Sequence, residues 1–292
     1  MADRWPLSAF GDEIASDLED QIAALQEQSV GAVELRSAWG INVVDMDEET
    51  LDRAHRLLDA AGLKVSAIGS PVGKVSIADD PGSELARLRA AIEAARRLDT
   101  TRIRIFSFFI PDGRYMEFRD EVLRLLSVFA HESEQSGIEL VHENESYIYG
   151  DDAQRCLDLV ESVGSPALRI AFDPANFVQV GVKPYDDAWP LLAEYVTHFH
   201  VKDAVGVDRE GGPPYPARAE ELQLMASVRP AGEGEGQLDK LLPALDMHNY
   251  RGFLVVEPHL AFRLHEMDGA QRFAVALGAL RRLLVETAAK PH

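Results

Sequence analysis

The sequence predicts a single (β/α)₈ barrel, in which eight parallel strands alternate with eight helices. Three observations favour this fold. The chain has 292 residues, close to the roughly 250 that such a barrel needs. Short apolar runs alternate along it with amphipathic stretches, and no Gly/Ser-rich linker divides it. We therefore expect residues 1–292 to form one domain.

The predicted strands are short apolar runs bounded by polar or turn-forming residues. In chain order they cover residues 5–10, 32–35, 64–69, 102–107, 138–143, 168–173, 197–202 and 253–258. Between them, apolar residues recur three or four positions apart, which predicts helices; clear examples lie at 51–61, 85–95 and 273–284. A doubly wound open sheet is the alternative, but it usually carries a Gly-rich first turn, whereas this chain has GDEIASD.

Residues 204–236 separate the seventh and eighth predicted strands. This segment is too long for a plain connection, so we predict a lid or active-site loop at the mouth of the barrel. Its glycine-rich end, GEGEG at 232–236, matches neither GxGxxG nor a P-loop. We interpret that run as a flexible turn before a helix at 237–248.

Composition narrows the class of protein. Hydrophobic residues make up 46% of the chain and charged residues 27%, as in soluble globular proteins. A net charge of −20 repels phosphate backbones and anionic lipid, so neither nucleic acid nor a membrane is an expected partner. The start of the chain lacks the pattern of a secretory signal. We predict a cytoplasmic protein with a small-molecule partner; a homo-oligomer is left open. The one cysteine, Cys156, is interpreted as a small buried side chain in a helix.

Polar residues concentrate at the ends of the predicted strands, where the catalytic groups of (β/α)₈ barrels lie. Charged groups that follow apolar strands are costly unless they are paired, hydrated or bound to a metal. Several such ends converging on one mouth therefore predict an active site. The residues are Asp12, Glu13, Glu34, Arg36, Ser70, Ser107, Glu143, Asp173, His198, His200, Lys202 and Glu257.

Four of these residues form a metal-ligand set: Glu143, Asp173, His200 and Glu257. Three carboxylates and one imidazole favour a single divalent ion, with Mn²⁺ first and Mg²⁺, Co²⁺ or Zn²⁺ as alternatives. His198 shares a strand face with His200 because the two are two residues apart. We assign it to substrate binding, with a satisfied interior histidine as the alternative.

Sequence motifs in the C-terminal half resemble those of the xylose-isomerase-like (β/α)₈ superfamily of sugar isomerases and epimerases. The matching segments are LVHEN (140–144), IAFDPANF (170–177), HFHVKD (198–203), GEGEGQLDKLLPAL (232–245) and YRGFLVVEPH (250–259). The N-terminal half agrees more loosely, through FGDE, VELR and SPVGK. The resemblance implies that the four residues of the set bind the metal and that Glu143 and Glu257 are also the acid/base pair. Asn176 departs from the pattern, because many members have a histidine there.

The predicted reaction is proton abstraction next to a carbonyl through a metal-stabilised enediolate, which gives isomerisation or epimerisation of a sugar or polyol. An inosose-dehydratase-like or keto-sugar lyase is the alternative, followed by a hydrolase or nuclease and by a catalytically silent binding barrel. Lys202 is assigned as an extra catalytic donor, or else as a salt-bridge partner of Asp203 or Asp173. Arg36 is assigned to substrate binding, or to an ion pair with Glu13 or Glu34. Asn176 is assigned to a substrate hydroxyl.

Overall fold

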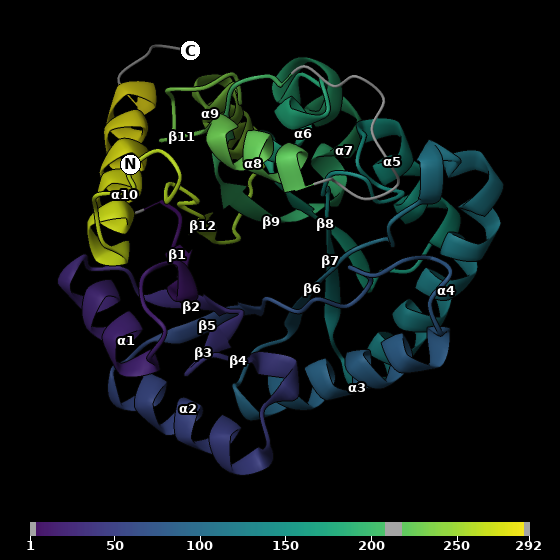
Figure 1. Ribbon diagram of the computed structural model, residues 1–292, viewed down its shortest axis with the longest axis horizontal. Helices are drawn as coiled ribbons and strands as arrows, with labels where there is room; N and C mark the ends of the chain where they lie inside the picture. Colours follow the sequence, from purple (N-terminus) through teal and green to yellow (C-terminus); the bar gives the residue numbers. More distant parts are fainter. Residues whose placement is uncertain (1–3, 208–217, 289–292) are drawn as a thin grey trace.

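The computed structural model, which describes residues 4–207 and 218–288, contains a closed barrel of eight parallel strands (Figure 1). Around the ring the order is β1-β12-β9-β8-β7-β6-β5-β2, and β2 closes it by pairing with β1. Each strand coincides with one of the predicted runs, and only β9 begins a residue earlier than its run, so the predicted fold is confirmed. The strands are β1 (Leu7–Phe10), β2 (Ala32–Leu35), β5 (Lys64–Ile68), β6 (Arg102–Ile105), β7 (Glu139–Glu143), β8 (Leu168–Phe172), β9 (Val196–Val201) and β12 (Leu254–Val256).

Helices form a layer outside the barrel (Figure 1). The last helix lies beside the first, where the Arg281 side chain donates a hydrogen bond to the backbone oxygen of Gln28. The helices are α1 (Leu18–Glu27), α2 (Glu48–Ala60), α3 (Pro81–Arg97), α4 (Tyr115–Ser136), α5 (Ala153–Val163), α6 (Pro174–Gln179), α7 (Trp189–Leu192), α8 (Arg218–Ser227), α9 (Leu238–Met247) and α10 (Gly269–Ala288). None of the helices in the described ranges is long and apolar enough to cross a membrane.

The apolar spacing seen in the sequence explains how these helices pack. In α10, Phe273, Leu277 and Leu280 recur on one face, and all three are fully buried. Burial of one such stripe on each helix against the barrel is the main favourable term for the fold. Cys156 of α5 is buried as predicted, and this burial raises the pKa of its thiol.

The predicted long connection lies between β9 and β12. Its described part contains a small antiparallel pair, β10 (Asp203–Ala204) with β11 (Val228–Arg229), and the helix α8. A second small pair, β3 (Ser37–Ala38) with β4 (Ile41–Asn42), follows β2. Residues 208–217 of the predicted lid lie outside the described residues.

Candidate metal centre

Strand β9 directs three side chains of the HFHVKD motif into the barrel. Side chains alternate between the two faces of a strand, so His198, His200 and Lys202 share the inner face, and all three are buried. Lys202 directly follows the last residue of the strand, Val201. The three side chains therefore stand at successive heights toward the carboxyl end of the barrel.

Three carboxylates converge on His200. Glu143 is the last residue of β7, while Asp173 and Glu257 directly follow β8 and β12. The Nδ1 atom of His200 lies 3.5 Å from Glu143 Oε1, 3.8 Å from Asp173 Oδ2 and 3.8 Å from Glu257 Oε2. One ligand atom from each of the four buried residues lies within 4.8 Å of the others. The structure thus brings the whole predicted ligand set together.

The chemistry of this cluster fits a divalent cation. The Nδ1 atom of His200 has no hydrogen-bond partner among the described residues, although its side chain is fully buried. A buried polar atom of this kind usually has a partner in a native protein. Ligand atoms about 2.1 Å from a shared ion lie roughly 3.4 Å apart at tetrahedral angles, close to the separations around His200. These residues can therefore hold an ion with little rearrangement.

Two asparagines hold Asp173 and Glu143 in position through hydrogen bonds. Asn144 exchanges two 2.9 Å hydrogen bonds with the backbone of Asp173, one in each direction. Asp173 caps helix α6, since its Oδ1 accepts the backbone N–H of Asn176 at 3.0 Å. The Asn176 side chain in turn donates to Glu143 Oε1 at 3.0 Å. Asn176 therefore orients a candidate ligand and also lines the pocket described below.

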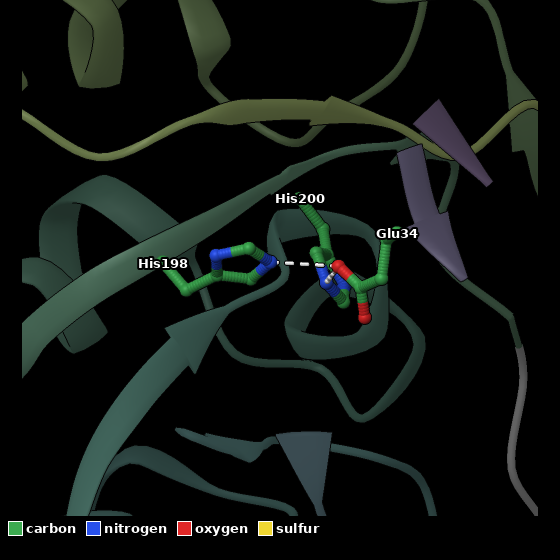
Figure 2. Close-up of side chains that lie close together, drawn as sticks. All are labelled: Glu34, His198 and His200. Carbon is green, nitrogen blue, oxygen red and sulfur yellow. Dashed lines mark hydrogen bonds and ion pairs between the residues drawn. The ribbon is translucent and has the colours of Figure 1, made fainter. Parts of the chain in front are cut away.

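Glu34 at the end of β2 holds both histidines from across the barrel. In Figure 2, dashed lines join one oxygen of its carboxylate to both rings: Oε2 lies 2.7 Å from His198 Nε2 and 3.3 Å from His200 Nε2. Glu34 faces the Nε2 side of His200, which leaves Nδ1 directed at the carboxylate cluster. A carboxylate in this position commonly fixes the tautomer of a metal-binding histidine. His198 lies in this fully buried layer.

Arg104 is a functional candidate that sequence reasoning missed. It comes from the RIRI run of β6, and its Nη1 lies 3.1 Å from Glu143 Oε2. Its guanidinium packs over the rings of Phe10 and Phe106. The sequence did offer one signal for Arg104, since it is a charged residue within an apolar predicted strand.

A second network surrounds Glu257. Arg36 binds Asp12 at 2.7 Å and Glu13 at 2.8 Å, and its Nη1 is 3.7 Å from Glu257 Oε1. The predicted alternative of a pair with Glu13 therefore occurs in the structure, joined by Asp12. His259, which sequence reasoning also missed, lies 3.0 Å from Glu13 and 3.4 Å from Glu257. It follows Glu257 by two residues, in the motif segment that ends in EPH.

Lys202 contacts two carboxylates of the cluster. Its Nζ is 2.8 Å from Asp173 Oδ2 and 2.9 Å from Glu257 Oε2. The predicted ion pair with Asp173 is therefore present. Asp203 has a different set of partners, because neighbouring residues of a strand point to opposite faces.

Asp203 organises the GEGEG segment. Its carboxylate accepts the backbone N–H groups of Gly232, Gly234 and Gly236 at 2.8–3.1 Å. A Cβ on Gly234 would lie 2.3 Å from Asp203 Oδ1, so the close approach requires glycine. From the sequence, the run is interpreted as a flexible turn, whereas in the structure three hydrogen bonds to Asp203 hold it in place.

Neighbouring cations keep two of the candidate ligands ionised. Burial opposes ionisation of Glu143, but the charges of His200 and Arg104 lower its pKa to about 2. Burial also opposes ionisation of Glu257, yet Lys202 and His259 lower its pKa well below the usual value. Both side chains are therefore carboxylates near neutral pH.

A pocket of about 420 Å³ opens beside the cluster. Lys74, Asn176, Lys202 and His259 line its polar side. Part of the long loop lines it too, through Glu221, Leu222, Leu224, Met225 and Val228. The described part of the loop thus borders the pocket, as predicted for a lid.

A profile described as Xylose isomerase-like TIM barrel matches residues 22–282. The chain belongs to this family. Xylose isomerase-like TIM barrels are largely enzymes, with isomerase, epimerase and decarboxylase members.

Among curated relatives, 3-oxo-isoapionate decarboxylase from Pectobacterium atrosepticum is 32% identical over 117 residues. The match spans 40% of this chain and 40% of that enzyme. A xylose isomerase domain protein from Planctomyces limnophilus superposes with a TM-score of 0.73 at 21% identity, covering 98% of this chain and 99% of that one. A xylose isomerase-like TIM barrel protein from Mycobacterium smegmatis, in complex with magnesium, gives 0.70 at 14% identity and covers 99% of each chain. At these identities, the two structures show a shared fold.

Proposed function

We propose that this protein is a divalent-metal-dependent enzyme that isomerises or epimerises a small sugar or polyol. The observation that carries the proposal is the convergence of Glu143, Asp173, His200 and Glu257 beside a pocket of about 420 Å³. We further propose Mn²⁺ as the preferred ion and the cytoplasm as the location.

The proposed chemistry moves a proton on a carbon next to a carbonyl. When bound, the divalent ion stabilises negative charge that develops on the substrate oxygens. Glu143 and Glu257 come from β7 and β12, which are separated around the ring by β8 and β9. They can therefore face a substrate from different sides. Because both are ionised, either can accept the proton and return it.

Other residues bind or orient in this proposal. Lys202 lines the pocket and can donate to a substrate oxygen, and Asn176 can bind a substrate hydroxyl while holding Glu143. Arg36 is paired with Asp12 and Glu13 and faces Glu257, so we propose that it holds these carboxylates in place. His198 lies fully buried against Glu34, which supports a positioning role in place of substrate contact.

A lyase is the second candidate. Its specific support is the local similarity to a decarboxylase that acts on a 3-oxo acid. Loss of CO₂ or water next to a carbonyl develops negative charge at the same atoms as isomerisation does. Lys202 would then form an ion pair with the substrate carboxylate that is lost as CO₂, or donate a proton to a leaving hydroxyl.

Incubation in D₂O distinguishes these reactions. Metal-analysed protein is mixed with free ketoses, inososes and 3-oxo sugar acids, and products are followed by NMR and mass spectrometry. For isomerisation or epimerisation, we expect deuterium at the carbon next to the carbonyl and no loss of CO₂ or water from the substrate. Loss of CO₂ or water would instead establish the lyase, and His200→Ala should lose both metal and turnover. A wild-type protein that binds no divalent metal would contradict both enzyme proposals and leave a binding barrel.

A further inference from the structure

The Lys202 ammonium rests on oxygens that belong to the candidate ligand set. Its Nζ lies 2.8 Å from Asp173 Oδ2 and 2.9 Å from Glu257 Oε2. Those same two oxygens are each 3.8 Å from His200 Nδ1. Lys202 is 6% exposed, so little water screens it from the carboxylates.

The other oxygens of these two carboxylates are already engaged. Asp173 Oδ1 accepts the backbone N–H of Asn176 at 3.0 Å. Glu257 Oε1 faces His259 Nδ1 at 3.4 Å and Arg36 Nη1 at 3.7 Å. An ion held by His200, Asp173 and Glu257 would therefore have to use the oxygens that Lys202 contacts.

The charges around the site also indicate that Lys202 opposes binding of a cation. The three carboxylates of the ligand set face two cations, Lys202 and Arg104, within 3.1 Å. An imidazole that ligates an ion is neutral, so in the metal-loaded site the three carboxylates and two cations sum to one net negative charge, which the divalent ion changes to one net positive charge. Without Lys202, the same ion would leave the site neutral. The ammonium therefore opposes the ion in a region of low dielectric constant.

We propose that Lys202 and the divalent ion compete for Asp173 Oδ2 and Glu257 Oε2. Binding of the ion turns the ammonium away from the cluster and into the pocket that Lys202 already lines. There it meets an oxygen of the substrate that carries or develops negative charge. In the metal-loaded protein the ammonium is thus released from the two carboxylates and available to the substrate. This inference rests on the proposed function, because it requires that the cluster bind a divalent metal.

Calorimetric titration of Mn²⁺ into metal-free protein tests the competition. Lys202→Met removes the ammonium and keeps an unbranched side chain, so it should bind Mn²⁺ at least about tenfold more tightly than wild type. Lys202→Arg keeps the charge and should stay near the wild-type affinity. Lys240→Met is the matched control, because Lys240 forms a half-exposed pair with Asp186 away from the cluster.

The outcomes separate this inference from the function on which it rests. Wild-type protein that binds no Mn²⁺ would contradict the proposed function. If wild-type protein binds Mn²⁺ and the Mn²⁺ affinity of Lys202→Met is equal or weaker, the competition is overturned while the proposed function stands. Lys202 would then support metal binding and not oppose it.

A measurement on the wild-type protein covers the case in which Lys202→Met does not fold. Reductive methylation with formaldehyde and cyanoborohydride labels accessible amines, and mass spectrometry reports the labelling of each lysine. Saturating Mg²⁺ should increase the labelling rate of Lys202 at least about threefold while Lys240 stays constant. An equal or lower rate for Lys202 with Mg²⁺ would overturn the proposal.

Discussion

At the scale of single residues, the site depends on charges that hold one another in place. Glu257 contacts Lys202, His259 and Arg36, and Glu13 binds the last two of these cations. Buried charges are tolerated when they are paired in this way, and removal of one partner leaves the other uncompensated. Substitutions in this network therefore affect both chemistry and stability, and their tests need readouts that separate the two.

The first prediction concerns Glu257 as a proton carrier. Glu257→Gln keeps the shape and one oxygen ligand but removes the base. In protein verified to retain its metal, kcat should fall at least about a hundredfold. Glu132→Gln is the control, because Glu132 pairs with Arg89 on exposed helices and should leave kcat unchanged. Near-normal turnover of metal-loaded Glu257→Gln would assign the glutamate to metal binding only.

The second prediction concerns Glu13 and acid stability. Burial opposes its ionisation, but His259 and Arg36 lower its pKa from 4.5 to about 2. A carboxyl group whose pKa is lowered on folding stabilises the protein above pH 4.5, and this stability is lost as the pH falls toward 2. Its full size is on the order of 3 kcal/mol.

Urea unfolding of metal-free wild type and Glu13→Gln at pH 5, 4 and 3 measures this contribution. The difference between the two free energies of unfolding should be largest at pH 5 and should shrink steadily at the lower values. A difference that does not change with pH would show that Glu13 contributes through contacts other than its charge.

At the scale of elements, the connection between β9 and β12 is anchored by Asp203. Its three hydrogen bonds to the GEGEG segment fix the chain just before α9, and the adjacent β10–β11 pair leads into α8 at the pocket. The side chain of Gln179 in α6 donates to the backbone oxygen of Leu224, which ties the end of α8 to the barrel. The pocket wall formed by α8 thus depends on contacts at its carboxyl end.

Gly234→Ala tests this anchor. The added Cβ would lie 2.3 Å from Asp203 Oδ1 and 2.5 Å from the backbone oxygen of Ala204, so the turn has to open. We expect a loss of about 1–3 kcal/mol in the free energy of unfolding, as for other overpacked sites. Gly31→Ala is the control, because a Cβ there meets no atom within 4 Å. Equal stability of the two variants in a denaturant titration would contradict the anchor.

At the scale of the whole molecule, we expect metal binding at the acidic cluster to stabilise the fold. An ion that binds only the folded protein at a hundred times its Kd stabilises it by about 2.7 kcal/mol. For a chain of 292 residues, that corresponds to a rise in Tm of roughly 4–5 °C. Calorimetry with Mn²⁺ and with EDTA measures the shift, and His200→Ala should abolish it. A wild-type Tm that is the same in both conditions would argue against a structural link between the ion and the fold.

Much of the architecture could be predicted because its causes are local. Alternation of side chains along a strand has a period of two, so the HFHVKD motif alone places His198, His200 and Lys202 on one face. Parallel barrel strands end at a common mouth, so Glu143, Asp173 and Glu257 could be expected to meet there. The segment 204–236 was recognisable by its length alone. These inferences need only the residue types, their spacing and the topology of the barrel.

The sequence by itself thus determined the barrel, the family and the convergence of the four candidate ligands. Only the tertiary structure decided how the charges pair, since that depends on which side chains face each other across the barrel. Glu34 meets His198 from 164 residues away, and no spacing rule connects them. Arg104 and His259 likewise acquire their roles from partners far away in the sequence, Glu143 and Glu13. For Lys202 the sequence left Asp203 and Asp173 open as partners. The closed barrel placed it between Asp173 and Glu257, because those two strand ends flank its own.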